Sequence, residues 1–258
     1  MRRRRHTVCA PRRGAARAVR ADRAEHLRRG FGRARSRCDA LGCRRPALAV
    51  RTTRVSIYAL KGRFQDLLRP GVRVLYRLGV TANQVTAAAA LLSLLVAAVV
   101  YTQGAAQPLW YALLPLWMLL RMALNAVDGM LAREFGQQSR LGAYLNELCD
   151  VVADAALYLS LLGVPGVGAG WLWLMALTAA LTEYAGVLGL MVGASRRYDG
   201  PMGKSDRAFV IGVLGLLLAG AWIGAATVTA VAMAVALLCA ATVLRRVAAG
   251  LREAAARA

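Results

Sequence analysis

Histidine is scarce in this chain of 258 residues, and the only two, His6 and His26, lie near its N-terminus. The sequence after residue 54 therefore has no histidine, which excludes His-based zinc sites and Ser-His or Cys-His nucleophile pairs from that part. The five cysteines form no CxxC pair and no disulfide framework. Acidic residues number 13, against 34 lysines and arginines, so each carboxylate inside an apolar stretch is a notable feature.

Residues 1–54 lack lysine and any long apolar run but contain 18 arginines and three acidic residues. We expect this segment to be disordered, and it is not a secretory signal because no apolar stretch follows the arginines. A polybasic tail for anionic lipid headgroups fits it better than a nucleic-acid-binding arm, and we expect no nucleic-acid partner. Our favoured hypothesis is that the start of the protein is mis-assigned and that Val55 is the true first residue.

The rest of the chain predicts an all-α integral membrane protein. Hydrophobic residues make up 58% of the sequence, and several runs approach the roughly 20 residues that span a bilayer. Residues 55–80 contain an amphipathic helix, at 56–78 with an interruption at Pro70, that would lie in the membrane interface. A six-helix domain at 81–246 and a cytoplasmic tail at 247–258 follow. The six predicted spans are 83–102, 109–131, 141–162, 171–193, 208–224 and 226–244.

Lysine and arginine are absent from the connections at 103–108, 163–170 and 222–226. The connections on the other side carry Arg133 and Arg140, then four basic residues between 196 and 207, and Arg245 with Arg246 follow the last span. Basic loops stay in the cytoplasm, so this alternation predicts that both termini are cytoplasmic. We expect a bacterial-type inner membrane protein.

Carboxylates occur where lipid makes them costly, because an ionisable residue at membrane depth costs roughly 2.5–3.5 kcal/mol on insertion scales. Asn125 and Asp128 lie near the end of the second span, and Asn146, Asp150 and Asp154 share one face of the third. Glu147 borders that face. The two spans are joined by a short loop, so they can bring these oxygen ligands to one point. Oxygen ligands without His or Cys suit Mg²⁺ or Mn²⁺ rather than zinc.

Basic and small residues surround these carboxylates in a way that suits a diphosphate substrate. Cationic side chains would offset the negative charge of the diphosphate that the metal does not neutralise. Small side chains would let a bulky ligand approach the helices. The cations are Arg133, Arg140, Lys204 and Arg207, and the small residues are Gly129, Ala132 and Gly142.

The segment 125–150 resembles the signature of the CDP-alcohol phosphotransferase family, D-x2-D-G-x2-A-R-x8-G-x3-D-x3-D. Here it reads Asn125-x2-Asp128-Gly129-x2-Ala132-Arg133-x8-Gly142-x3-Asn146-x3-Asp150, with every spacing kept. The resemblance covers roughly residues 60–245 and includes TANQVT at 81–86, which is similar to the segment that opens the family's first span. Asparagine replaces aspartate at positions 125 and 146.

The resemblance implies that Asp128 binds metal and that Asp150 is the base that acts on the acceptor hydroxyl. Asn125 and Asn146 still offer carbonyl oxygens, and we expect Glu147 and Asp154 to compensate for the two missing charges. The resemblance also implies transfer of a phosphatidyl group from a CDP-linked donor to an alcohol, with release of CMP. We expect the donor to be CDP-diacylglycerol. A homodimer is expected from the resemblance alone.

Two other functions stay open at this point. A catalytically weak relative would bind a CDP-linked lipid without turnover, because two aspartates are missing. A small ion-coupled transporter would use the intramembrane carboxylates to carry ions or protons. The acceptor alcohol is not identified by the sequence, although the basic residues near 204–207 favour one that carries a phosphate.

Overall fold

The computed structural model describes residues 57–257, and in this part every regular element is a helix. The all-α fold class is therefore confirmed. The predictions for residues 1–54 lie outside the described residues. The elements in chain order are α2 (Ile57–Arg77), α3 (Ala82–Gln103), η2 (Pro108–Ala112), α4 (Leu113–Glu134), α5 (Arg140–Leu159), η3 (Ser160–Gly163), α6 (Ala169–Met191), α7 (Lys204–Ala219) and α8 (Ala225–Arg257).

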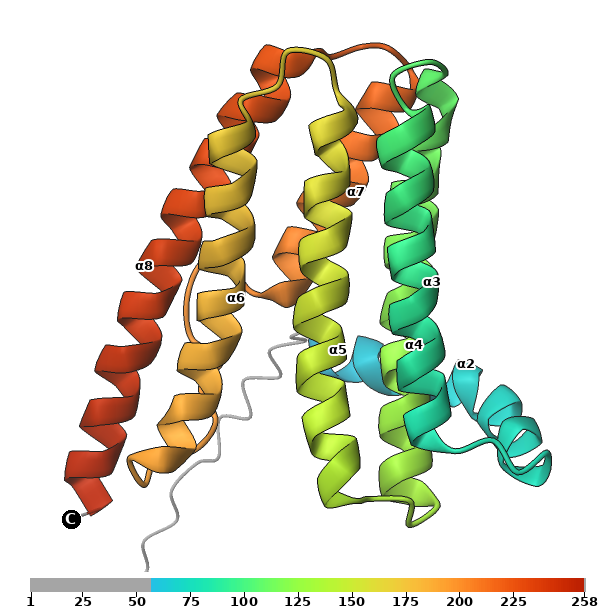
Figure 1. Ribbon diagram of the computed structural model, residues 1–258. Coiled ribbons are helices and arrows are strands. Elements are labelled where there is room, and N and C mark those ends of the chain that lie inside the picture. Colours follow the sequence, from blue (N-terminus) through green and yellow to red (C-terminus); the bar gives the residue numbers. More distant parts are fainter. Residues whose placement is uncertain (1–56, 258) are drawn as a thin grey trace, which may run out of the picture. The chain divides into compact units, whose positions relative to one another are not determined.

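Long helices pack side by side in this unit (Figure 1). α3 packs against both α4 and α5, α6 packs against α8 and α5, and α7 packs against α4. α4 and α5 run in opposite directions, and α3 packs against both of them. The signature residues lie on α4 and α5.

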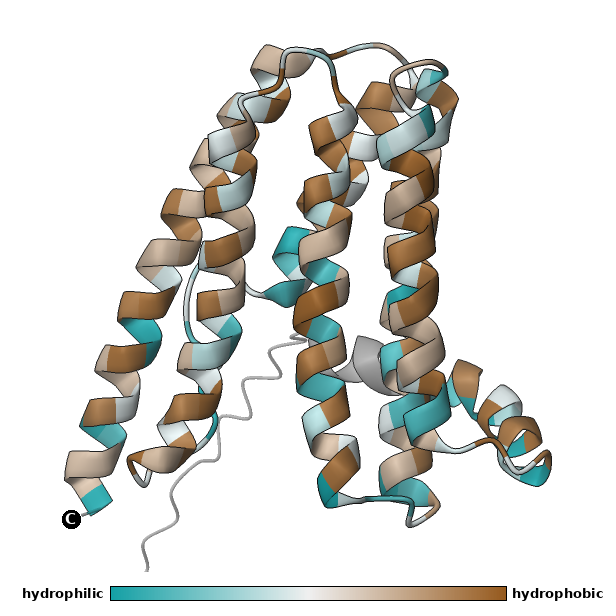
Figure 2. Cartoon of the chain, in the orientation of Figure 1, coloured by the Kyte–Doolittle hydropathy of each residue, from teal (hydrophilic) through white to brown (hydrophobic). Residues whose placement is uncertain are grey.

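Within residues 57–257, four stretches are long and apolar enough to cross a membrane: Ala82–Gln103, Pro108–Glu134, Ala169–Met191 and Ala225–Arg257. α5 carries three carboxylates and α7 has only 16 residues. That these two helices also cross the membrane, which would give six spans, stays a prediction. Large exposed apolar side chains such as Leu91, Leu116 and Leu119 fit a surface that contacts lipid. Figure 2 shows the hydrophobic colour along α3 to α8, with hydrophilic residues mostly in the lower half of the view.

Local capping explains where two helices begin. Thr81 caps α3: its hydroxyl accepts a hydrogen bond from the Gln84 amide at 3.3 Å, and the Gln84 side chain accepts one from the Thr81 amide at 2.9 Å. Ser139 caps α5 by accepting from the Gly142 amide at 2.9 Å. These caps fix the first turns of α3 and α5, which form two walls of the pocket described below.

The amphipathic helix predicted at 56–78 is present as α2, but the predicted interruption at Pro70 is wrong, because the helix continues through that residue. Val72, two residues after Pro70, is fully buried against a small core that includes Val127 and Leu131 of α4. Arg69 forms ion pairs with Asp66 at 3.0 Å and with Glu134 at 3.1 Å. Packing of this helix against α4 therefore outweighs the helix-breaking tendency of Pro70. Its position in the membrane interface stays a prediction.

The last two helices differ from the predicted limits. α7 ends at Ala219 rather than at 224, and Gly220 to Gly224 form the connection. α8 continues to Arg257, so residues 247–257, which we expected to be a tail, are helical. Glu253 in this extension pairs with Arg197, and both its oxygens accept from Ser195, at 3.2 Å from the amide and 2.9 Å from the hydroxyl. The extension thus holds the loop between α6 and α7.

Candidate active site at the junction of α3, α4 and α5

A pocket of about 420 Å³ opens between the first turns of α3, the end of α4 and the first half of α5. Its volume falls within the roughly 300–1,000 Å³ typical of small-molecule sites. All eight signature positions line it: Asn125, Asp128, Gly129, Ala132, Arg133, Gly142, Asn146 and Asp150. Residues spread over 26 positions of the sequence thus converge on one cavity, as the helix spacing predicts.

Asp128 is one of two carboxylates in the pocket wall, and it is only 6% exposed. Its Oδ2 accepts a hydrogen bond from the Thr86 hydroxyl at 2.8 Å. Thr86 belongs to the TANQVT segment and also lines the pocket. The first turns of α3 therefore fix the orientation of this carboxylate.

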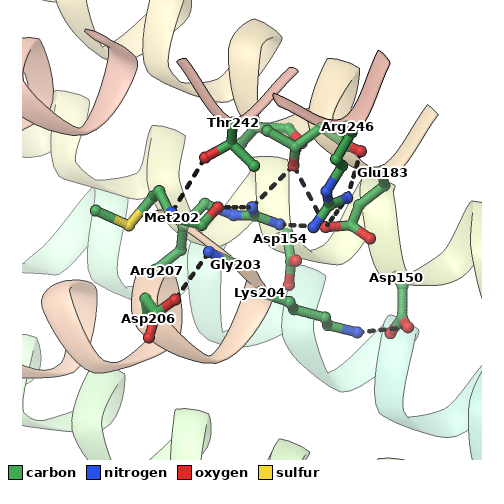
Figure 3. A network of polar contacts seen from close by, with 12 residues as sticks. Asp150, Asp154, Glu183, Met202, Gly203, Lys204, Asp206, Arg207, Thr242 and Arg246 are labelled. Carbon is green, nitrogen blue, oxygen red and sulfur yellow. Dashed lines mark hydrogen bonds and ion pairs between the residues drawn. The ribbon is translucent and has the colours of Figure 1, made fainter. Parts of the chain in front are cut away.

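Asp150, the other carboxylate, is held from three sides. Its Oδ1 accepts from Arg121 Nη2 at 3.1 Å and from Asn125 Nδ2 at 3.4 Å. Its Oδ2 forms an ion pair with Lys204, which begins α7 (Figure 3). Asn125 and Asp150 thus join α4 to α5 across the pocket.

Side chains of the pocket wall lie close to both glycines of the signature. A Cβ at Gly129 would lie 2.8 Å from the guanidinium of Arg133, which lies over that glycine. A Cβ at Gly142 would lie 2.7 Å from Oδ1 of Asn83, another residue of the pocket wall. Absence of these side chains is therefore what leaves room for Arg133 and Asn83.

Five other predicted site residues do not line this pocket. Lys204 is one of them, and it reaches the site through its ion pair with Asp150. Asp154 is buried and paired with Arg121, and Glu147 is paired with Arg196. Arg207 is only 1% exposed and lies deeper, with its Nη2 2.8 Å from Glu183 Oε1. Arg140 is exposed at the start of α5. The expectation that Glu147 and Asp154 would replace the missing aspartates has no support in this arrangement, because each is already matched by an arginine.

Arg207 is the centre of a second, buried polar network (Figure 3). Its guanidinium also donates to the Thr182 hydroxyl at 2.9 Å, to the Met202 carbonyl at 3.2 Å and to the Tyr158 hydroxyl at 3.3 Å. Each of its three nitrogens has at least one acceptor, as a buried cation requires. Arg207 therefore ties α7 to α5 and α6, which sets the position from which Lys204 reaches Asp150.

Arg196 lies in the loop between α6 and α7 and pairs with Glu147 of α5. Burial opposes the charge of Arg196, but the hydrogen bonds and negative charge of Glu147 outweigh it and hold the pKa of Arg196 above its ordinary value. This loop arginine is thus a permanent cation that connects α5 to the α6–α7 loop.

Sequence reasoning missed Arg121, the buried partner of Asp150 and Asp154. A signal was present, because Arg121 is the one charged residue within the predicted span 109–131 apart from Asp128, and it lies one helical turn before Asn125. A charge in such a place predicts a polar partner. Thr86 and Asn83 belong to the TANQVT segment, and the sequence alone indicates no individual role for either residue.

The donor set decides which metal the pocket can hold. In the described residues no group of three or more His, Cys, Asp or Glu side chains is placed to bind a metal ion. The available ligands are two carboxylates and the amide oxygens of Asn125 and Asn146, all of them oxygen. Such a set fits a hard divalent cation and does not fit zinc.

Comparison with known proteins decides the family. The family model described as CDP-alcohol phosphatidyltransferase matches residues 79–244. This chain belongs to that family. A curated member of similar sequence is the inner membrane protein YnbA of Escherichia coli, which is 49% identical over 165 residues, 64% of this chain and 81% of YnbA. The resemblance seen in the signature is confirmed, and with it the assignment to a class of membrane-bound transferases of phospholipid synthesis.

Solved structures of a CDP-alcohol phosphatidyltransferase-like fold agree with the helical arrangement. Phosphatidylinositol phosphate synthase (PgsA1) of Mycobacterium tuberculosis, in complex with manganese and citrate, is 20% identical with a TM-score of 0.60, covering 70% of this chain and 88% of that one. The same enzyme with CDP-DAG bound gives 20% identity and a TM-score of 0.56, covering 72% and 92%. At this identity the likeness shows the fold.

Proposed function

We propose that the chain transfers a phosphatidyl group from CDP-diacylglycerol to an alcohol and releases CMP. The observation that carries this proposal is the convergence of all eight signature positions on one pocket. PgsA1, which shares the fold, has been solved with CDP-DAG bound and with manganese, and this supports a CDP-linked lipid and a divalent cation for the pocket described here. Whether Mg²⁺ or Mn²⁺ serves is left to the assay below.

The division of labour in the pocket follows from its contacts. Asp128, with the amide oxygens of Asn125 and Asn146, would hold the divalent cation, and when bound the cation polarises the phosphate and offsets the charge that develops on the leaving group. Arg133, which lines the pocket, would bind phosphate oxygens. We assign no ligand role to Glu147 or Asp154, because both pair with arginines away from the pocket.

Asp150 is the proposed base. It would take the proton of the acceptor hydroxyl while that oxygen bonds to the β-phosphorus of the donor, and the bond from this phosphorus to the CMP oxygen breaks with its electron pair. Arg121 and Asn125 hold Oδ1, and Lys204 holds Oδ2, so the carboxylate is oriented before the substrate arrives. Orientation of this kind is a large part of the rate gain that enzymes achieve.

Release of CMP is the measurement that tests the function. Purified protein would be incubated with CDP-diacylglycerol, Mg²⁺ or Mn²⁺ and a panel of alcohols with and without phosphate. We expect release with one acceptor class, and its loss in Asp128→Ala. Asp66→Asn, which removes a carboxylate that is 67% exposed on α2, is the matched control and should release CMP like the unaltered protein.

A relative that binds CDP-lipid without turnover is the second candidate, and the observation that favours it is the loss of two carboxylates at positions 125 and 146. It predicts donor binding without CMP release for every acceptor, and recovery of release in the double variant Asn125→Asp/Asn146→Asp. Release by the unaltered protein would eliminate this candidate.

We also propose that the chain lies in an inner membrane with both termini in the cytoplasm. The basic residues at the 133–140 and 196–207 connections and at 245–246 support this orientation. The name of the related YnbA, an inner membrane protein, supports the location.

A further inference from the structure

The acceptor hydroxyl has to reach Asp150, the proposed base, so the charges beside this residue decide what else the acceptor can carry. A phosphate monoester brings a charge of about −1.5 to −2 at pH 7. Such a group needs cations that no carboxylate of the protein already neutralises, because breaking an internal ion pair is costly. Arg121 is already shared between Asp150 and Asp154. The pairing of the basic residues at 196–207 therefore decides whether a phosphate-bearing acceptor fits.

Lys204 and Arg207, the basic residues at the start of α7, are both matched by carboxylates. Lys204 pairs with Oδ2 of Asp150 itself (Figure 3). Arg207 is 1% exposed, and its Nη2 lies 2.8 Å from Glu183 Oε1. Arg246 of α8 lies 3.8 Å from the same oxygen and donates to two backbone carbonyls. The sequence-based preference for a phosphate-bearing acceptor at these residues therefore has no support in the structure.

Arg196 contacts α5 about one turn before Asp150, where it pairs with Glu147. Its Nη2 donates to Glu147 Oε2 at 2.9 Å and lies 3.7 Å from Glu183 Oε2, while Nη1 donates to Glu147 Oε1. The remaining nitrogen, Nε, is buried, and the centroid of the Tyr198 ring lies 5.2 Å from Cζ. Glu147 thus occupies both terminal nitrogens of this arginine, as a bidentate phosphate would.

The remaining arginines of the pocket and of the α6–α7 loop are also engaged or too distant. Arg197 pairs with Asp199 at 2.8 Å. Arg140 begins α5, which places it about 15 Å before Asp150 along the helix axis, beyond the reach of a three-carbon alcohol. Arg133 lines the pocket, where the proposed function assigns it to the phosphates of the donor.

We propose that the acceptor of this chain is an alcohol without a phosphate group, and that Glu147 sets this specificity by holding Arg196 in an ion pair. The carboxylate of Glu147 supplies the two oxygens that the guanidinium would otherwise take from an acceptor phosphate. This inference rests on the proposed function, since it names the second substrate of that reaction. An uncharged polyol meets no such competition, because its hydroxyls need only neutral hydrogen bonds.

Two pairs of alcohols that differ only by a phosphate test the acceptor class. The full chain in detergent would receive CDP-diacylglycerol and Mn²⁺ with glycerol or glycerol 3-phosphate, and with inositol or inositol 1-phosphate. We expect kcat/KM for CMP release to be at least about tenfold higher for the phosphate-free member of a pair. An equal or higher value for the phosphate-bearing member would overturn the inference and leave the proposed function standing.

Binding of glycerol 3-phosphate tests the inference without turnover. Radiolabelled glycerol 3-phosphate would be dialysed against the full chain in detergent, with CDP and Mn²⁺ present to fill the donor side of the pocket. We expect no saturable binding by the unaltered chain. Saturable binding would overturn the inference, whether or not CMP is released in the assay.

Glu147→Gln releases Arg196 and should increase the affinity for glycerol 3-phosphate by at least about tenfold. Glu134→Gln is the matched control: it removes a carboxylate partner from Arg69 of α2, and because neither residue lines the pocket, no binding should appear. A folded Glu147→Gln variant without this gain would overturn the inference. The gain without CMP release from any alcohol would count against the proposed function only. If Glu147→Gln does not fold, the alcohol pairs and the binding by the unaltered chain still decide.

Discussion

Arg121 is a buried cation that reaches two aspartates of α5 from α4. It donates to Asp154 and Asp150, and its Nη2 also donates to the Asp150 carbonyl at 3.1 Å. One guanidinium thus neutralises a buried carboxylate and orients the proposed base. Fork-like donor geometry of this kind is specific to arginine, and lysine would not reproduce it.

Removing Arg121 should destabilise the protein strongly. Arg121→Leu leaves the buried Asp154, 9% exposed at its side chain, without its partner, and breaking a buried pair in this way costs about 3–5 kcal/mol. Thermal unfolding in detergent measures the loss. The double variant Arg121→Leu/Asp154→Leu should regain most of the stability, because no buried charge is left unpaired; a double variant as unstable as the single one would contradict this account.

Asparagine in place of aspartate at 125 has a local advantage. Its Nδ2 donates to Asp150, whereas an aspartate there would place two carboxylates side by side. Asn125→Asp alone should therefore lower stability by about 1 kcal/mol in the absence of metal, and added Mn²⁺ should reverse the loss. Unfolding curves of the variant and the unaltered protein, with and without Mn²⁺, test this. If the variant is as stable as the unaltered protein in the absence of metal, the two aspartates do not repel each other.

Helix α6 holds the loop between α6 and α7 through backbone hydrogen bonds. The Arg197 amide donates to the Gly186 carbonyl at 3.0 Å, and the Ala194 amide donates to the Gly189 carbonyl at 3.0 Å. A Cβ at Gly186 would lie 2.8 Å from the Arg197 carbonyl oxygen. The loop that carries Arg196 thus packs directly on the backbone of α6.

A methyl group at Gly186 should push this loop away. Gly186→Ala is expected to cost about 1–3 kcal/mol by overpacking, and Gly170→Ala on the same helix, where nothing lies within 4 Å, is the control. The control should be neutral or gain about 0.5–1 kcal/mol from the better helix former. Unfolding of the two variants under the same conditions measures the difference, and equal stabilities would contradict the close contact.

Most helices were predictable from the sequence, because long apolar runs bounded by Gly, Pro and polar turns indicate where a helix begins and ends. The exceptions have local causes. Pro70 interrupts the pattern of 56–78, but burial of Val72 keeps α2 continuous. Residues 247–257 end the apolar run yet continue α8, because they are rich in alanine and arginine, which favour helix, and Glu253 anchors them to the α6–α7 loop.

The candidate site was predictable where it depends on spacing and not where it depends on distant partners. Residues at i, i+3 and i, i+4 share a helix face, so the position of Asp128 and Asp150 in one pocket follows from the sequence. Glu147 and Arg196 are 49 residues apart, and Arg121 and Asp154 are 33 apart. Which arginine meets which carboxylate is set by packing of whole helices, so the sequence alone could not exclude Glu147 and Asp154 as ligands.

At the scale of the whole molecule, cysteine labelling tests the proposed orientation in the membrane. Both termini and the 133–140 and 196–207 connections should face the cytoplasm, and the 163–168 connection should face away from it. Single cysteines at Ser195 and at Gly166, introduced into a cysteine-free variant, would be labelled with a membrane-impermeant reagent in intact cells. We expect labelling at 166 only; labelling at 195 alone would reverse the proposed orientation.

Asp150 is the proposed base of a phosphatidyl transfer in the α3–α4–α5 pocket. Asp150→Asn keeps the shape of the side chain but removes its ability to take a proton. The direct test compares this variant with the unaltered protein in both CDP-diacylglycerol binding and the turnover number for CMP release. We expect kcat to fall by about 10²–10⁴ while donor affinity stays within a few-fold. Turnover by Asp150→Asn equal to that of the unaltered protein would contradict it.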